Sequence, residues 1–108
     1  MKLIIFDEAL DEIDELVAWY AERNPIAAQR LMNLFYEAVK RIESKPTQFS
    51  LLEIPRNPGD LRRVLLEGFP AYVAYQLHDK EVHVVAVAHA ASKPGHWKSR
   101  LRRKRRKR

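Results

Sequence analysis

The sequence predicts an α+β fold, β-α-α-β-β-β, in which a helical hairpin packs on an antiparallel sheet. Three features of the chain predict this order: a short β-branched run at the start, two amphipathic segments joined by a short link, and three strand-like runs in the second half. The links between these last three runs are too short for the crossover that a parallel pair needs, so they should be antiparallel neighbours. A chain of 108 residues fits one domain with one core.

The first strand is expected over residues 2–6, KLIIF, and the first helix over residues 7–23. Asp7 can cap the N-terminus of this helix, and the acidic residues that follow it favour the positive end of the helix dipole. The acidic side chains that fall away from the apolar face are interpreted as solvated. That apolar face is formed by Leu10, Ile13, Val17 and Tyr20, which recur at helical spacing.

The second helix is expected from residue 25 to about residue 45. Asn24 is a good N-cap, and Pro25 is tolerated in the first turn because its missing N–H would be unpaired there anyway. Pro46 disfavours a helical conformation in the residue before it, so the helix should end near Lys45. Two helices joined by so short a link form an antiparallel hairpin. The apolar stripe of the second helix consists of Leu31, Leu34, Phe35, Ala38 and Ile42.

The remaining strands are expected over residues 61–67, 71–77 and 81–89, and the segment FSLLEI before them could form a short edge strand. Residues 98–108 carry nine Lys or Arg and no acid, which leaves 11 basic and 14 acidic side chains on residues 1–97. We therefore divide the chain into a mildly acidic domain, residues 1–97, and a short C-terminal helix or basic tail, residues 98–108.

The composition argues against several classes of protein. Cysteine is absent, so neither disulfides nor thiolate metal sites are available. No apolar run approaches the roughly 20 residues of a membrane span, and the first strand is too short for the apolar region of a signal peptide. Neither a Gly-rich phosphate loop, nor an acidic metal cluster, nor a serine triad is visible in the sequence. We therefore expect a cytoplasmic protein with no metal and no cofactor.

Two neighbouring strands carry candidate binding residues. Arg62 and Arg63 are adjacent, so one of them must share a face with apolar residues. That arginine either snorkels to the rim of the sheet or presents its guanidinium to a phosphate or a carboxylate. Tyr72 and Tyr75 fall on opposite faces of the next strand, so one should be core and the other could stack a base or contact a partner. Trp97 is expected to pack over the end of the sheet.

The four histidines do not suggest a metal site. His83 and His89 lie at the same parity of one strand but roughly 20 Å apart along an extended chain. His78 is expected in a turn, where it would be solvated. His89 should hydrogen-bond the chain as it turns out of the sheet. The alternative for His89 or His96 is a general base, although spacing identifies no partner carboxylate.

Several short motifs occur in a fixed order along the chain. They are F-D-x-A at Phe6 to Ala9 before an acidic helix, Pro46 after the second helix, LRRVLLEGFP followed by Tyr75, and then His89, Pro94, Trp97 and Arg100. Together, over about residues 3–100, they resemble the RelE/ParE superfamily of toxins from type II toxin–antitoxin modules, in the branch labelled plasmid stabilisation proteins. The resemblance implies the fold predicted above, a cognate antitoxin that wraps the toxin, and growth arrest when the antitoxin is degraded.

The superfamily divides by target. The RelE-like branch resembles a ribosome-dependent mRNA endoribonuclease, and the ParE-like branch resembles an inhibitor of DNA gyrase. Ser92 stands where many relatives have arginine, with Lys93 beside it as a partial substitute, and Trp97 stands where the nuclease branch has tyrosine. An indole N–H donates a hydrogen bond but does not exchange a proton as an acid would. These departures favour a ParE-like, non-enzymatic gyrase inhibitor over an endoribonuclease or a non-catalytic nucleic-acid-binding member.

Each of these hypotheses has its own candidate residues, taken from the resemblance and from the residue chemistry described above. An antitoxin could dock on the sheet face or in the groove beside the helical hairpin. The basic tail, residues 98–108, either binds nucleic acid or adheres non-specifically. If all nine of its charges met phosphates, the logarithm of the binding constant would fall with the logarithm of the salt concentration with a slope of about −8 at most. The residues expected to bind the target are Arg62, Tyr75, Lys93, Trp97 and Arg100. The catalytic candidates of a nuclease are Arg62, Arg63, His89, Lys93 and His96. The nucleic-acid-binding tail consists of Arg102, Arg103, Lys104, Arg105, Arg106, Lys107 and Arg108.

Overall fold

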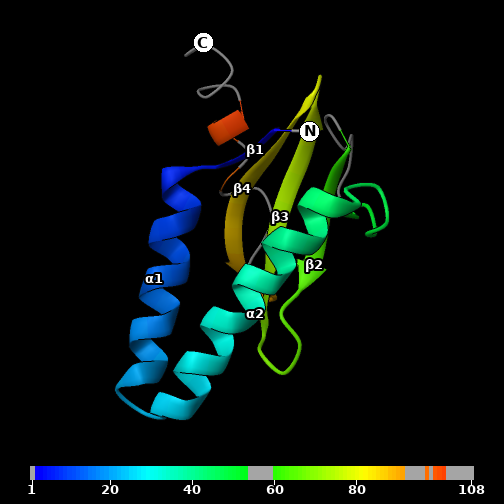
Figure 1. Ribbon diagram of the computed structural model, residues 1–108. Coiled ribbons are helices and arrows are strands. Elements are labelled where there is room, and N and C mark those ends of the chain that lie inside the picture. Colours follow the sequence, from blue (N-terminus) through cyan, green and yellow to red (C-terminus); the bar gives the residue numbers. More distant parts are fainter. Residues whose placement is uncertain (1, 54–59, 92–96, 98, 102–108) are drawn as a thin grey trace.

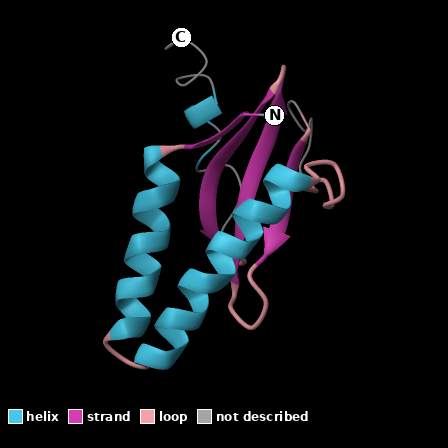
Figure 2. Ribbon diagram, viewed as in Figure 1, coloured by secondary structure: helices cyan, strands magenta, loops and turns pink. Residues whose placement is uncertain are grey.

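The computed structural model describes residues 2–53, 60–91, 97 and 99–101, and its fold is of the predicted α+β class (Figure 1). Both helices lie on one face of a four-stranded sheet, whose strand order is β1-β4-β3-β2 (Figure 2). The elements in chain order are β1 (Lys2–Ile5), α1 (Asp7–Ala21), α2 (Pro25–Ser44), β2 (Leu61–Leu65), β3 (Ala71–His78) and β4 (Glu81–His89).

The sheet is antiparallel except for its first strand. β2 and β4 both pair with β3 in antiparallel fashion, as their short links require. β1 pairs with β4 in parallel, so the sheet is mixed rather than purely antiparallel. The reason is that the helical hairpin separates β1 from the other strands and supplies the long connection that a parallel pair needs. β1 pairs only with residues 81–84, and the rest of that edge of β4 has no strand beside it among the described residues.

The start of α1 differs from the prediction. Phe6, not Asp7, is the N-cap, and no side chain caps this helix. Phe6 is held in an extended conformation because its N–H donates to the Val84 carbonyl at 2.9 Å, while its own carbonyl accepts from the Ala9 N–H at 3.0 Å. Asp7 therefore occupies the first helical position, where its charge favours the positive end of the dipole. α1 ends at Ala21, two residues before the predicted end.

The predicted boundaries of α2 are confirmed. The Asn24 side chain accepts a hydrogen bond from the Ala27 N–H at 3.1 Å, and Pro25 is the first helical residue. The helix ends at Ser44, with Lys45 as its C-cap. In the described part of the segment FSLLEI, residues 49–53, there is no strand, only an isolated bridge between Leu51 and Arg62.

The buried face of α2 gives a direct test of the core. Ile42 is fully buried, whereas Leu34 is only partly buried. We expect Ile42→Ala to lower the free energy of unfolding by about 2–5 kcal/mol, because the neighbours cannot fill the cavity completely. Leu34→Ala should cost clearly less in the same urea titration. Equal costs for the two variants would mean that the two positions are equally packed.

Gly68, in the turn between β2 and β3, adopts a φ of +91°. A Cβ at this position would lie 2.4 Å from Nη2 of Arg30. We expect Gly68→Ala to lower the free energy of unfolding by at least about 1 kcal/mol, because alanine is strained at this φ and also meets the guanidinium. Thermal unfolding measures the loss. In the double variant with Arg30→Ala, only the part of the lost stability that comes from the clash with the guanidinium should return. Complete return of the free energy of unfolding would show that backbone strain at Gly68 contributes nothing.

Candidate functional surfaces

Arg62 and Tyr75 hold the segment that follows α2. Nη1 of Arg62 donates to the Phe49 carbonyl at 2.6 Å and to the Thr47 carbonyl at 3.3 Å. The Tyr75 hydroxyl donates to the Pro46 carbonyl, and its buried ring packs edge-on against the Phe49 ring. Nη1 of Arg62 thus binds backbone carbonyls of the protein itself, and its buried Nε has no hydrogen-bond partner among the described residues. Both Arg62 and Tyr75 fix the position of residues 46–49, and their direct contact with a target stays a prediction.

Tyr75 should make stability depend on pH in alkaline solution. Burial raises the pKa of its hydroxyl to about 12, although the nearby Arg62 lowers it. An unfolded tyrosine titrates near pH 10, so its contribution to stability is fully present below that pH. We expect this contribution to fall as the pH rises from about 10 to about 12, because only the unfolded state then loses the proton. Urea unfolding of the wild type and Tyr75→Phe at several alkaline pH values tests this, and the variant should lose less stability over that range.

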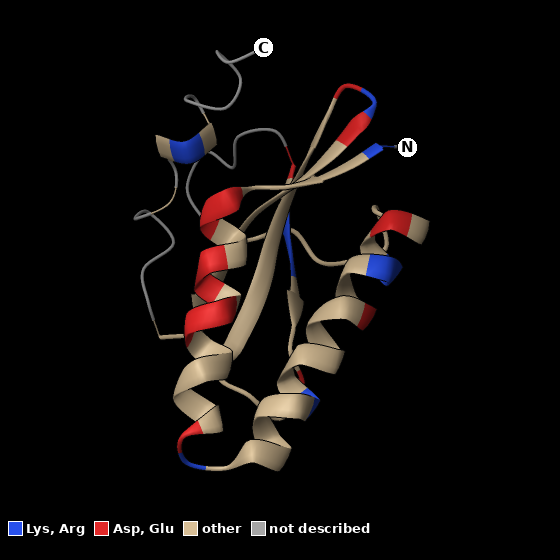
Figure 3. Ribbon diagram, turned by 60° about the vertical axis from the view of Figure 1, so that its left-hand side comes forward, with Lys and Arg blue, Asp and Glu red and all other residues tan. Residues whose placement is uncertain are grey.

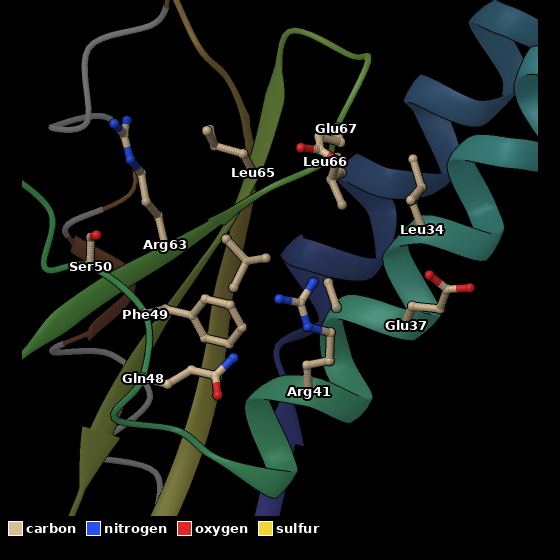
Figure 4. A pocket seen from close by; sticks show the side chains of 12 residues that line it. Leu34, Glu37, Arg41, Gln48, Phe49, Ser50, Arg63, Leu65, Leu66 and Glu67 are labelled. Atoms are coloured by element: carbon tan, nitrogen blue, oxygen red, sulfur yellow. The ribbon is translucent and has the colours of Figure 1, made fainter.

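A groove of about 540 Å³ lies between α2 and β2 (Figure 4). Figure 4 shows Arg41 directed from α2 toward the Phe49 ring, and the guanidinium carbon lies 5.1 Å from the ring centroid. Arg63 is exposed and extends from β2, with its guanidinium carbon 5.6 Å from the Tyr72 ring centroid. We call this site the α2–β2 groove, and the lining residues that matter below are Leu34, Glu37, Arg41, Phe49, Leu66 and Glu67.

Glu12 and Arg100 join α1, β4 and the C-terminal segment. The two guanidinium nitrogens of Arg100 lie 3.0 and 2.8 Å from the two carboxylate oxygens of Glu12. Glu12 also accepts from the Val87 N–H at 2.9 Å, and Arg100 donates to the Val85 carbonyl at 3.0 Å. These side chains thus supply hydrogen-bond partners to the backbone of β4 at Val85 and Val87, beyond the end of β1. The hydrogen bond to Glu12 raises the pKa of Arg100, while burial lowers it.

Trp97 lies inside the protein rather than on a binding surface. Its side chain is 0% exposed, and the nearby Leu101 is buried too. Trp97 lies next to Tyr72. Burial raises the pKa of the Tyr72 hydroxyl, and the neighbouring Trp97 and the charge of Arg63 lower it in part. Strand alternation places Tyr72 on the opposite face of the sheet from Tyr75. The prediction that Trp97 packs on the sheet is therefore confirmed, and its buried side chain is not available for the direct target contact that was expected. Arg100 is engaged by Glu12, and its contact with a target stays a prediction.

A second groove, of about 470 Å³, lies between α1 and the end of β4. Trp19 is half-exposed on its rim, with the Arg23 guanidinium carbon 3.9 Å from the centre of its ring. Figure 3 shows a row of acidic residues along the first turns of α1, so the groove has an apolar floor beside a negative helix. We call it the α1–β4 groove, and its main lining residues are Glu15, Leu16, Trp19, Tyr20, Val87 and His89.

The comparisons with known proteins agree with this architecture. Residues 3–94 match the family model for the ParE toxin of the type II toxin–antitoxin system parDE. The chain is a member of the ParE toxin family. It is 33% identical over 94 residues to Toxin ParE2 of two Mycobacterium tuberculosis strains, CDC 1551/Oshkosh and ATCC 25618/H37Rv, covering 86% of this chain and 85% of each relative. A solved structure described as the chromosomal ParDE TA system from P. aeruginosa matches the fold with a TM-score of 0.68 and 21% identity, over 82% of this chain and 95% of that one.

The histidines of this ParE-family toxin are partly as predicted. Nδ1 of His89 accepts from the Ala91 N–H at 3.1 Å, which confirms that His89 holds the chain as it leaves the sheet. His83 is buried, pairs with Glu81 at 2.8 Å, and has its ring centre 5.6 Å from that of His78. The expectation that His78 is solvated in a turn is wrong, because His78 is the last residue of β3 and is partly buried. The sequence did not predict its ring contact with His83, because that contact depends on the β3–β4 register. Within the described residues, no group of three or more His, Asp or Glu side chains is arranged to hold a metal ion.

Other predicted site residues lie outside the part of the toxin that the structure describes. These are Ser92, Lys93, His96 and residues 102–108, which include the basic tail. None of the described helices is both long and apolar enough to cross a membrane.

Proposed function

We propose that this ParE-family toxin inhibits DNA gyrase and is neutralised by a cognate antitoxin. The observation that carries the proposal is the match of residues 3–94 to the ParE toxin family. The site geometry supports it as well. Arg62 and Tyr75 fix the segment after α2, and Glu12 and Arg100 fix the C-terminal segment, so less ordering entropy is lost when a protein target binds these surfaces.

The geometry supports the endoribonuclease alternative less well. RNA cleavage through the 2′-hydroxyl needs groups that exchange protons, together with cations around the scissile phosphate. The guanidinium of Arg62 binds two backbone carbonyls, and the hydroxyl of Tyr75 holds its proton up to a pKa of about 12. Arg63 and His89 are exposed and remain candidates, together with Lys93 and His96 outside the described residues.

The decisive experiment is a supercoiling assay with purified gyrase. The toxin should block supercoiling of relaxed plasmid, and full activity at saturating toxin would reject the proposal. Primer extension on RNA from induced cells tests the alternative in parallel. New 5′ ends within coding regions, together with unaffected gyrase, would assign the protein to the endoribonuclease class.

For the antitoxin, we propose that an amphipathic helix docks in the α1–β4 groove. The apolar floor suits the apolar face of a helix, and the acidic start of α1 suits basic residues on the helix rim. Leu16→Arg should prevent co-purification with the co-expressed antitoxin, whereas Ile26→Arg, at an exposed position on α2, should not. Unchanged co-purification of the Leu16→Arg variant would place the antitoxin elsewhere.

The basic tail supports a second, non-catalytic role in binding nucleic acid. Seven consecutive cations follow Leu101 in the sequence. Because Leu101 is buried, the informative deletion removes residues 102–108 only. We expect this deletion to abolish retention on DNA and to leave thermal unfolding unchanged. Equal DNA retention by the truncated protein would show that the tail does not bind nucleic acid.

A further inference from the structure

Strand β2 is an edge strand, and the described chain covers only its first half. The Arg63 N–H donates to the Ser50 carbonyl at 3.1 Å, and the Leu61 carbonyl accepts from the Leu52 N–H at 2.9 Å. Backbone groups alternate between the two sides of a strand, so the N–H and carbonyl of Leu65 point to this same outer side. No backbone group of the described residues pairs with Leu65 there. The first half of this edge therefore binds an extended segment, and within the described part of the chain the outward backbone groups of Leu65 are free to pair with another.

The α2–β2 groove runs beside this free half of the edge. Leu34 from α2 and Leu66 after β2 line the same stretch of the groove (Figure 4). The Leu65 side chain is 59% exposed, an unusual position for a leucine on a short strand. A strand added to the edge would direct alternate side chains into the groove. Apolar residues at alternate positions are thus the chemistry that fits.

The charges along the groove define the direction of such a strand. Glu37 and Glu67 lie toward the end where β2 leaves the sheet, and Arg41 lies toward the other end, above Phe49 (Figure 4). Arg41 stacks on Phe49 and has no carboxylate partner among the described residues. An antiparallel strand would begin near Glu67 and run toward Arg41.

The strand cannot continue past Arg63, because Ser50 already occupies that part of the edge. A strand that must stop beside an arginine is best completed by a chain end, whose carboxylate can form charge-assisted hydrogen bonds with the guanidinium. We propose that the free half of the β2 edge captures the extended C-terminus of a partner protein. Its terminal carboxylate faces Arg41, its alternate apolar side chains enter the α2–β2 groove, and its basic residues lie near Glu67.

The test uses the full-length toxin and a fluorescein-labelled hexapeptide, KKVTVL, with either a free C-terminal carboxylate or an amide. Fluorescence anisotropy should show saturable binding of the acid peptide and about tenfold weaker binding of the amide. Arg41→Gln should bind both peptides at the weaker level. Arg23→Gln, which removes a cation in the turn between α1 and α2, should bind like the wild type. Equal affinity of the two peptides for the wild type, or no binding at about 1 mM, would overturn the proposal.

A second variant tests the backbone pairing. Leu65→Pro removes only the outward N–H of the edge, which proline allows on an edge strand. It should weaken binding of the acid peptide at least about tenfold, and unchanged binding would contradict strand addition. If thermal unfolding shows that this variant is not folded, an N-methylated peptide tests the same pairing from the ligand side with the same two outcomes. None of these measurements involves gyrase, so failure here and failure of the proposed target are distinguishable.

Discussion

Replacing Trp97 by alanine should lower the free energy of unfolding by about 3–5 kcal/mol. The side chain is 0% exposed, and it is the largest fully buried residue of the described chain. Its removal leaves a cavity against Tyr72 that small shifts of the sheet cannot close. Urea unfolding followed by far-UV circular dichroism measures the loss, because that signal does not depend on tryptophan.

The chain supplies its own matched control, since Trp19 is the other of its two tryptophans and is 51% exposed. Trp19→Ala should cost much less stability, and the fluorescence of this variant, which then comes from Trp97 alone, should show the blue-shifted maximum of a buried indole. Gyrase inhibition separates the two roles considered for Trp97. A loss of inhibition without a loss of stability would return Trp97 to the target-binding surface.

The fold could be predicted from the sequence because its signals are local. Helical spacing of apolar residues, the cap at Asn24 and the stop at Pro46 act within a few residues, and the structure confirms the helices that they define. The start of α1 was misjudged because a tertiary bond holds Phe6, namely the one from its N–H to the Val84 carbonyl. The parallel β1–β4 pair was likewise missed, because short links constrain only the strands that they join.

The candidate surfaces were harder to predict because their partners are backbone groups distant in sequence. Arg62 and Tyr75 were predicted to bind a target, but their hydrogen bonds to the carbonyls of residues 46–49 could not be predicted, because any residue type offers a carbonyl. Glu12 was expected only to favour the positive end of the first helix dipole, as one of the acidic residues that follow Asp7. Its position next to the buried Ile13 was the one signal in the sequence that Glu12 could be shielded from water. Its partner could not be predicted, because Arg100 lies 88 residues away along the chain. Burial of that pair has a large consequence for stability.

Arg100→Ala should lower the free energy of unfolding by about 3 kcal/mol. The side chains of Arg100 and Glu12 are only 13% and 22% exposed, so removing the cation leaves a carboxylate that is largely shielded from water. The Val85 carbonyl also loses a donor at the edge of β4. Arg23→Ala is the matched control, because its ion pair with Glu22 is exposed, with side-chain exposures of 50% and 78%. Exposed pairs of this kind contribute about 0–1 kcal/mol.

A double-mutant cycle separates the ion pair from the other contacts of each residue. Glu12→Gln keeps an oxygen for the Val87 N–H but removes the charge. The double variant, Glu12→Gln with Arg100→Gln, should lose less free energy of unfolding than the sum of the two single variants. Each single variant leaves one buried charge without its partner, whereas the double variant leaves none. Additive costs in urea unfolding would mean that the two side chains act independently. Among the described residues of the C-terminal segment, the buried side chains of Trp97 and Leu101 would then hold it in place by packing rather than by charge.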